Sequence, residues 1–278
     1  MTISAFVVSY NRESTIEACL RSLRFADELI VIDKGSNDKT FEISHDIADK
    51  VYRVEWSPTV ERTRLEALAL REHENIVFLD DDECFSIDAV NFFKDEDRNG
   101  FSDGYYIPCR HFILGWHSTT SYYWPERSLR AFKKGCVQFS ENVHSGIQYH
   151  GSVTSFPHYE SGIYFSNLSH VNAGQWIEKT NRYTSQIERA TFFFDDGERP
   201  FYDQMRDRLY YWMVERTSSR KEYDQIVAAL RAIYDLIDFI KCWEIKIDPD
   251  GEKSFDDFCR IIIENHKDNL RLYGKASR

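Results

Sequence analysis

Residues 76–83 have the sequence Ile-Val-Phe-Leu-Asp-Asp-Asp-Glu, in which four apolar residues are followed directly by four acids. The apolar half is typical of a short buried strand. Carboxylates packed this densely at the rim of a low-dielectric core repel one another unless a proton or a cation lies between them. The stretch therefore predicts a divalent-metal site at the end of a strand. The competing interpretation is a solvated turn whose acids cap a helix.

Apolar runs and amphipathic stretches alternate before this segment. They predict strands at residues 3–8, 29–32 and 51–54 and helices at 16–23, 39–48 and 57–71. Residues 14–17 match a capping box, and Ser57-Pro58 predicts the N-cap and first helical position of the third helix. Strands that alternate with helices predict βαβ crossovers, and so an α/β fold whose mostly parallel sheet is covered by helices on both faces.

Polar segments follow three of the predicted strands, namely Ser9-Tyr10-Asn11, residues 33–36 and residues 80–83. In parallel sheets, ligands bind beyond the carboxyl ends of the strands. We therefore expect these segments to converge on one rim and to form a nucleotide pocket.

The remainder of the chain changes character twice. Residues 100–170 are rich in aromatic side chains among short strand-like pieces, which indicates either a sugar-stacking surface or core packing. After Asn172, helices are predicted at 173–194, 200–217, 221–243 and 253–272. We expect a catalytic domain over residues 1–170, with a nucleotide-binding half (1–99) and an acceptor-side half (100–170), and a C-terminal helical region over 171–278.

Composition limits the class of protein. The formal net charge is −11, which argues against a nucleic-acid partner, since such a surface needs a basic face. The six cysteines form no CxxC pair, as expected for reduced thiols in the cytoplasm. We expect no signal peptide and no spanning helix, because the start lacks a basic segment before a long apolar one and no window approaches 18 uncharged apolar residues.

Three motifs together resemble those of the family 2 glycosyltransferases. They are residues 10–13 (Tyr-Asn-Arg-Glu), residues 31–40 (Val-Ile-Asp-Lys-Gly-Ser-Asn-Asp-Lys-Thr) and residues 79–83 (Leu-Asp-Asp-Asp-Glu). Arg64 stands where that family carries an arginine ahead of the acidic motif. The resemblance implies a GT-A fold and a nucleotide-sugar donor.

A second resemblance narrows the group. Residues 124–132 (Trp-Pro-Glu-Arg-Ser-Leu-Arg-Ala-Phe), followed by Val143-His144, are similar to the branch that contains the lipopolysaccharide and lipooligosaccharide core β-glucosyltransferases. Ala131 stands where that branch has leucine, and Ser145 stands where it has glutamate. An acidic residue near the latter position commonly acts as the base, so either another carboxylate does so here or the activity is unusual.

The resemblance implies a role for each matched residue. Asp33 and the backbone near Tyr10 would hold the nucleobase, although Asp33 also suits a turn. Asp82 and His144 would bind Mn²⁺ or Mg²⁺ between the phosphates. Either Glu141 or Glu126 would act as the catalytic base. The residues assigned to the nucleotide sugar are Val8, Ser9, Tyr10, Asn11, Asp33, Arg64, Asp80, Asp81 and Arg130, the two arginines being equally suited to ion pairs within the fold.

The predicted activity is the inverting transfer of a hexose, such as glucose, from a UDP-sugar to a saccharide or lipid-linked saccharide acceptor. A protein acceptor and a non-catalytic nucleotide-sugar-binding relic remain as alternatives, and Cys84 disfavours a haloacid-dehalogenase-like phosphatase, which needs Thr or Val there. Aromatic and arginine side chains in the helical region indicate either a peripheral contact with the inner face of the membrane or packing on the catalytic domain or a second copy.

Overall fold

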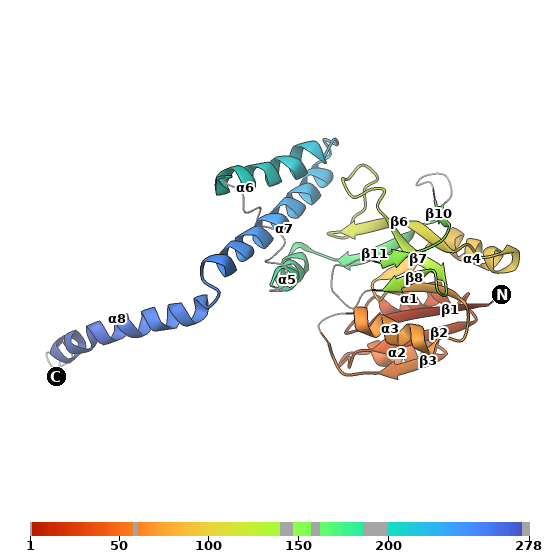
Figure 1. Ribbon diagram of the computed structural model, residues 1–278, viewed down its shortest axis with the longest axis horizontal. Helices are drawn as coiled ribbons and strands as arrows, with labels where there is room; N and C mark the ends of the chain where they lie inside the picture. The colour runs from red at the N-terminus through yellow and green to blue at the C-terminus, as the bar shows by residue number, and fades with distance from the viewer. Residues whose placement is uncertain (1, 58–59, 140–146, 157–161, 186–198, 274–278) are drawn as a thin grey trace. The chain divides into compact units, whose positions relative to one another are not determined.

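The computed structural model describes residues 2–57, 60–139, 147–156, 162–185 and 199–273 (Figure 1). The chain divides into two compact units, Met1–Ala173 and Gly174–Arg278.

Among the described residues, the first unit contains a nine-stranded mixed sheet with the main order β3-β2-β1-β4-β7-β6-β11-β5, and β10 pairs with β6. The strands β1 to β4 are Ile3–Ser9, Glu28–Asp33, Lys50–Arg53 and Asn75–Asp80. The others in this sheet are β5 (Glu83–Phe85), β6 (Gly104–Ile113), β7 (Arg127–Lys133), β10 (Val153–Ser155) and β11 (Phe165–His170), while β8 (Val137–Phe139) pairs with β9 (Ile147–Tyr149).

The predicted parallel arrangement holds for β1 to β4. Beyond β4 the sheet is mixed, because β7 runs antiparallel to both β4 and β6, and β5 runs antiparallel to β11. The second half of the sheet therefore does not consist of βαβ units, which is why its strands are poorly marked by alternation with helices.

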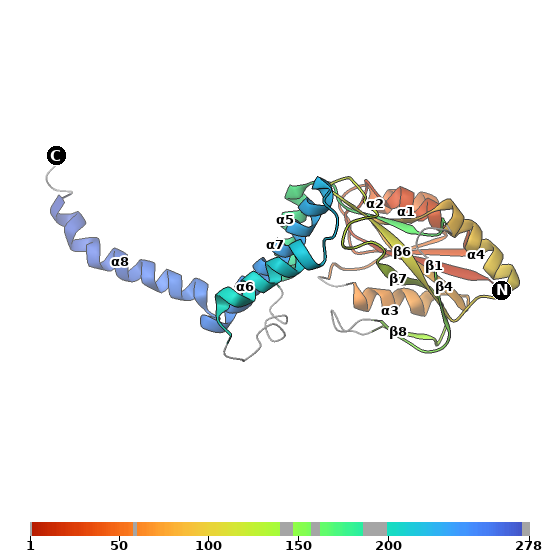
Figure 2. The same cartoon turned by 90° about the horizontal axis from the view of Figure 1, so that it is seen from above.

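Helices cover both faces of the parallel part (Figure 2). They are α1 (Ile16–Leu23), α2 (Thr40–Ile47), α3 (Glu61–Leu70) and α4 (Ile87–Asn99). Alternate residues of each strand face opposite sides, so Val7 packs in one buried cluster with residues of α1 and α4, whereas Phe6 packs in another with Ala67 of α3. Strands buried on both faces explain why the apolar runs of the sequence are continuous rather than alternating.

Two predicted helix starts are wrong. The capping box at residues 14–17 does not form, because the N-cap of α1 is Thr15 and its side chain makes no capping hydrogen bond. The Thr15 hydroxyl instead donates to the Asp81 carbonyl oxygen at 2.9 Å, so the acidic loop takes the group that would have capped the helix. Helix α3 begins at Glu61 after Val60 rather than at Ser57-Pro58, and Pro58 lies outside the described residues.

The second unit is helical. It contains most of α5 (Ala173–Thr184), together with α6 (Phe201–Tyr210), a π-helical turn η2 (Tyr211–Glu215), α7 (Glu222–Ile247) and α8 (Gly251–Tyr273). The predicted helix at 173–194 is described only as far as the end of α5, and the predicted helix at 200–217 is divided between α6 and η2. Phe201 of α6 stacks on Phe239 of α7 with ring centroids 4.9 Å apart. Across the described residues, no helix is both long and apolar enough to cross a membrane.

Candidate functional site

The carboxyl ends of β2, β1 and β4 lie next to one another. Ser9 is paired in register with Asp33, and Val8 is paired with Asp80. The strand order reverses beside β1, which is the place where open α/β sheets bind ligands. The three polar segments therefore meet at one rim, as the sequence predicted.

The loop after β1 binds the acidic segment directly. The Tyr10 amide donates to Asp81 Oδ2 at 3.1 Å, and Arg12 Nε donates to Asp81 Oδ1 at the same distance. A second nitrogen of Arg12 lies 3.4 Å from Asp82 Oδ2. Because the Asp82 side chain is only 7% exposed, Arg12 partly neutralises a buried carboxylate. Sequence reasoning gave Arg12 no role of its own.

Two further arginines hold the other acids of the loop. Arg64 forms an ion pair with Asp80. Arg130 donates to both oxygens of Glu83, at 2.9 and 2.8 Å, and lies 3.8 Å from Asp80. Its guanidinium group also lies over the ring of Phe165, 4.6 Å from the centroid. Both arginines thus form ion pairs within the fold, which was one of the two roles that the sequence allowed for them; the other was phosphate binding.

The electrostatic balance of this loop remains negative. Burial raises the pKa of Asp81 to about 6, against the lowering effect of Arg12, and the neighbouring Asp82 raises it as well. Burial also raises the pKa of Glu83, although Arg130 opposes the shift. Within the described residues, four carboxylates (80–83) face three arginines (12, 64 and 130). Such a dense group of carboxylates favours the binding of a further cation.

Asp33 shapes the turn after β2. Its side chain is fully buried and accepts hydrogen bonds from the Gly35 and Ser36 amides at 3.1 and 3.0 Å, while Arg53 lies 3.4 Å away. Gly35 has a φ of +79°, which a side chain would strain. The turn interpretation of Asp33 is therefore correct for this structure, and its contact with a nucleobase stays a prediction.

Asn11 joins the first two loops. It has a φ of +51°, a conformation that asparagine tolerates better than most residues. Its amide donates to Ser36 Oγ at 2.9 Å, and its side-chain oxygen accepts from the Asn37 amide at 2.9 Å. Asn11 thus positions the rim, and its predicted contact with the nucleotide stays untested.

An exposed aromatic pair lies beside this rim, of which the sequence predicted Tyr10 as a site residue but not Trp56. The ring centroids of Tyr10 and Trp56 lie 6.3 Å apart, and the two residues are 38% and 58% exposed. Among the described residues, the buried Ser9 hydroxyl has no hydrogen-bond partner. The signal for Trp56 was its place just after the third strand, between the polar residues Glu55 and Ser57. Unpaired polar and aromatic groups beside a charged loop suit a ligand that contains a planar base.

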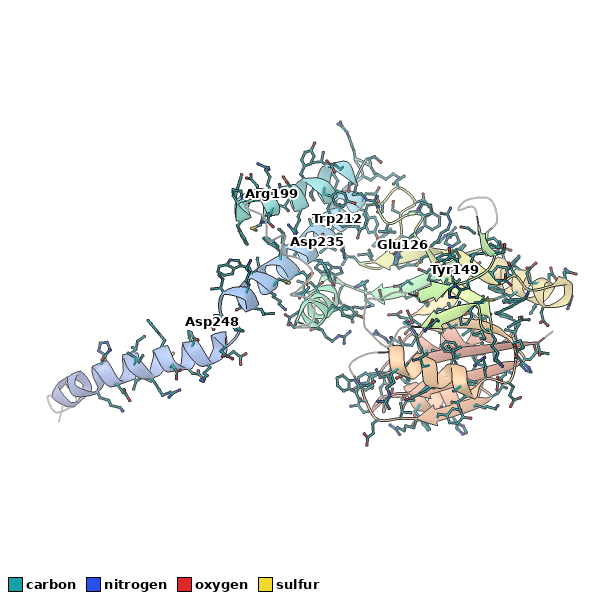
Figure 3. All side chains as sticks on the ribbon, in the orientation of Figure 1. Glu126, Tyr149, Arg199, Trp212, Asp235 and Asp248 are labelled. Atoms are coloured by element: carbon teal, nitrogen blue, oxygen red, sulfur yellow. The ribbon has the colours of Figure 1, made fainter. Side chains whose placement is uncertain are left out.

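The candidate base Glu126 lies at the start of β7, beside β6 (Figure 3). Its side chain is largely exposed, and Oε2 lies 3.0 Å from His111 Nε2. His111 is paired in register with Asn167, which is paired in turn with Glu83. Glu126 is thus connected across two strands to the acidic loop.

Glu141, His144 and Ser145 lie outside the described residues. The second candidate base and the proposed histidine ligand are therefore untested. Among the residues that are described, no three His, Cys, Asp or Glu side chains are placed to hold a metal ion together.

Comparison with known proteins agrees with the motifs. The protein is 26% identical over 216 residues to the lipopolysaccharide core biosynthesis glycosyltransferase LpsC of Rhizobium meliloti (strain 1021). The aligned residues cover 73% of this chain and 76% of LpsC.

Among solved structures, Staphylococcus aureus TarS (residues 1–349) is similar with a TM-score of 0.45 and 15% identity, covering 90% of this chain and 92% of TarS. Glucosyl-3-phosphoglycerate synthase of Mycobacterium tuberculosis, in complex with Mn²⁺ and UDP, is similar with a TM-score of 0.32 and 25% identity, covering 40% and 44% of the two chains.

The sequence model of glycosyl transferase family 2 matches residues 4–155, which is more than half of the chain and includes β1 to β7 and the whole acidic loop. The protein therefore belongs to glycosyl transferase family 2 and is a glycosyltransferase with the GT-A-like α/β fold that its motifs predicted.

Proposed function

We propose that this protein is a metal-dependent, inverting glycosyltransferase that moves a hexose, such as glucose, from a UDP-sugar to a saccharide acceptor of a cell-surface glycan. The observation that carries the proposal is the acidic loop at the end of β4, which is held against the end of β1 and keeps a surplus of negative charge. The name of LpsC supports a lipopolysaccharide core or a similar saccharide as the acceptor.

The donor would bind at the rim that β1, β2 and β4 share. The exposed rings of Tyr10 and Trp56 are close enough to contact the two sides or the edge of a planar base. The Ser9 hydroxyl offers a hydrogen bond, and Asp80 would accept one from the ribose. Arg64 lies beside Asp80 and would donate to a phosphate.

The predicted Mn²⁺ or Mg²⁺ fits the acidic loop through the chemistry of its donors. An ion that bridges a diphosphate needs only one or two protein carboxylates, since phosphate and water oxygens complete its shell. Asp82 would supply that carboxylate, and His144 is the predicted second ligand. The ion, when bound, would neutralise the charge that develops on the diphosphate as the bond to the sugar breaks.

The remaining chemistry falls to a carboxylate. An acceptor hydroxyl oxygen forms a bond to sugar C1 from the face opposite the departing UDP, which takes the electron pair of the broken bond. The hydroxyl proton passes to the base, for which Glu126 and Glu141 are the candidates. The contact between Glu126 and His111 orients the Glu126 carboxylate while leaving it exposed to solvent.

The test is donor turnover by the purified protein. UDP release is measured from a panel of UDP-hexoses with mixed saccharide acceptors, in Mn²⁺, in Mg²⁺ and in EDTA, together with the rise in melting temperature that each nucleotide causes. We expect metal-dependent release with one UDP-sugar. The variant Asp82→Asn should lower the rate by about 100-fold, whereas Asp46→Asn, at an exposed acid of α2, should leave it unchanged.

Three outcomes would change the proposal. UDP binding without turnover on any acceptor would favour the non-catalytic relic, and turnover only with a peptide acceptor would favour a protein glycosyltransferase. Full activity of Asp82→Asn in EDTA would remove both the metal and Asp82 from the mechanism.

A further inference from the structure

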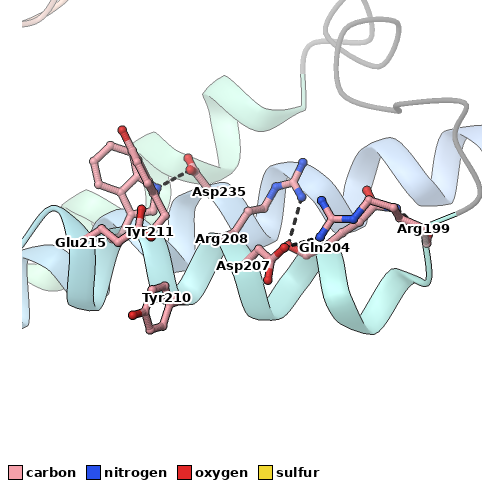
Figure 4. A pocket seen from close by; sticks show the side chains of 9 residues that line it. Arg199, Gln204, Asp207, Arg208, Tyr210, Tyr211, Glu215 and Asp235 are labelled. Carbon is pink, nitrogen blue, oxygen red and sulfur yellow. Dashed lines mark hydrogen bonds and ion pairs between the residues drawn. The ribbon is translucent and has the colours of Figure 1, made fainter.

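The second unit contains a cavity of its own. It has a volume of about 620 Å³, within the range of roughly 300–1,000 Å³ that is usual for small-molecule sites. It lies along α6, η2 and the facing part of α7 (Figure 4). Its lining residues combine aromatic, carboxylate, amide and guanidinium groups; they are Arg199, Gln204, Asp207, Arg208, Tyr210, Tyr211, Trp212, Glu215 and Asp235.

Aromatic rings at one end of the cavity are held in place. The ring centroids of Tyr211 and Trp212 lie 4.9 Å apart, nearly perpendicular to each other. The Trp212 indole donates to Asp235 of α7, and the two residues lie close together (Figure 3). Arg231 forms an ion pair with Asp235 at 3.1 Å, which fixes this carboxylate in turn. An indole restrained at its polar end keeps its ring in one orientation, as a stacking surface requires.

The π-helical turn brings these groups to the surface. The Arg216 amide donates to the Tyr211 carbonyl oxygen at 2.8 Å, which is the wider hydrogen bond of a π-helix. Tyr211 is 42% exposed as a result of its place in η2, and Glu215 at the end of the turn is exposed. Turns of this kind are rare in proteins and are frequently found at functional sites.

The charges of the cavity argue against an anionic ligand. Its lining holds three carboxylates but two guanidinium groups. Arg199 is paired with Asp207, and Arg208 lies over the Phe239 ring, 4.2 Å from its centroid, while donating to the Gln204 carbonyl oxygen. Arg206 also pairs with Asp207, and Arg231 pairs with Asp235, so the guanidinium groups around the cavity already have partners and leave little charge for a phosphate group. Aromatic faces beside planar carboxylate and amide groups instead suit an uncharged ligand with many hydroxyl groups.

We propose that this cavity binds a neutral saccharide, namely a part of the acceptor glycan other than the one that receives the hexose. The C–H face of a sugar ring would pack on Tyr211, beside Trp212, whose ring has the Arg231 guanidinium group 5.0 Å from its centroid. Its hydroxyl groups would donate to Glu215 and accept from Gln204 or Arg208. The identification of the ligand as an acceptor rests on the proposed function, but the binding of saccharide by this cavity does not.

Saccharide binding is tested on the full-length protein without donor. Neutral gluco- and galacto-oligosaccharides are titrated while tryptophan fluorescence is recorded and calorimetry measures affinity. Tyr211→Ala and Glu215→Gln should each weaken binding about tenfold, as for one strong contact of an interface. Tyr202→Ala is the matched control, because Tyr202 lies on α6, which η2 directly follows, is 72% exposed and does not line the cavity.

Failure of the proposed saccharide site can be distinguished from failure of the proposed function. Donor hydrolysis in the absence of acceptor should be the same in Tyr211→Ala and the wild type, since it depends only on the first unit. Absence of saturable binding by every saccharide, or equal binding by both lining variants and the wild type, would overturn the proposed saccharide site. Binding of inorganic phosphate that is lost in Arg208→Gln would also overturn it, in favour of an anion site. Absence of donor turnover by the wild type would contradict the proposed function, but it would not affect the conclusion about saccharide binding.

Discussion

The ion pair between Arg130 and Glu83 should dominate the stability of the candidate site. Arg130→Met would leave Glu83, which is 2% exposed, without the guanidinium group that binds both of its oxygens at 2.9 and 2.8 Å. Removing one partner of a buried pair costs about 3–5 kcal/mol, because the remaining charge has neither solvent nor counter-ion. We expect a loss of that size in the free energy of unfolding of the first unit, with a similar loss for Glu83→Gln.

The double variant separates this electrostatic effect from lost packing. With both charges removed, the uncompensated carboxylate is gone, so Arg130→Met combined with Glu83→Gln should be less destabilised than either single variant. The coupling energy from the double-mutant cycle should therefore exceed the cost of one single variant, about 3–5 kcal/mol. The control is Lys134→Met, which removes an exposed pair with Glu74 at 3.0 Å and should cost less than about 1 kcal/mol.

The assay is urea unfolding followed by fluorescence and by circular dichroism. Because the chain has two compact units, the free energies are comparable only where the two probes give coincident transitions. A loss below about 1 kcal/mol for Arg130→Met, or additive losses in the double variant, would refute the inference that Glu83 depends on Arg130 for its charge.

Two further predictions concern β2 and the rim. Glu28 is buried, and burial raises its pKa, but hydrogen bonds from Lys50, Ser4 and the Glu72 amide lower the pKa below the ordinary 4.5 overall. The stability that this carboxylate contributes is therefore present above pH 4.5 and is lost as the pH falls through its lowered pKa. Glu28→Gln should cost about 1.5–3 kcal/mol at pH 7, measured by urea unfolding, and an equal cost at pH 3 would contradict this. Trp56→Ala should weaken UDP binding about tenfold by calorimetry, whereas the exposed Trp116→Ala should not, and equal affinities would exclude stacking on Trp56.

The sequence predicted β1, β2 and β4 well, because each is buried on both faces and contains a continuous apolar run, whereas the short β3 is only partly buried. It did not predict α4, whose start is nonetheless marked by Ser86, the side chain of which accepts from the Ala89 amide. It misplaced the cap of α1 for a different reason. The Thr15 hydroxyl had two possible partners, and the choice between a local and a distant one depends on where the acidic loop lies in the fold.

The candidate site shows the same division between local and distant information. The order of motifs was sufficient to identify Asp33 and the acidic loop, because the carboxyl ends of neighbouring parallel strands necessarily share an edge. The pairing of carboxylates with arginines was not predictable, since Arg12, Arg64 and Arg130 come from three elements that only the folded sheet brings together.

These arginines explain how so acidic a loop remains folded before any ligand binds. Arg64 and Arg130 hold Asp80 and Glu83 at the two ends of the segment, and both are attached to parts of the fold that flank β4. Arg12 is shared between Asp81 and Asp82 in the middle of the segment. The acids at the ends thus fix the position of the loop between them, and Asp82 stays the residue that we propose as the metal ligand.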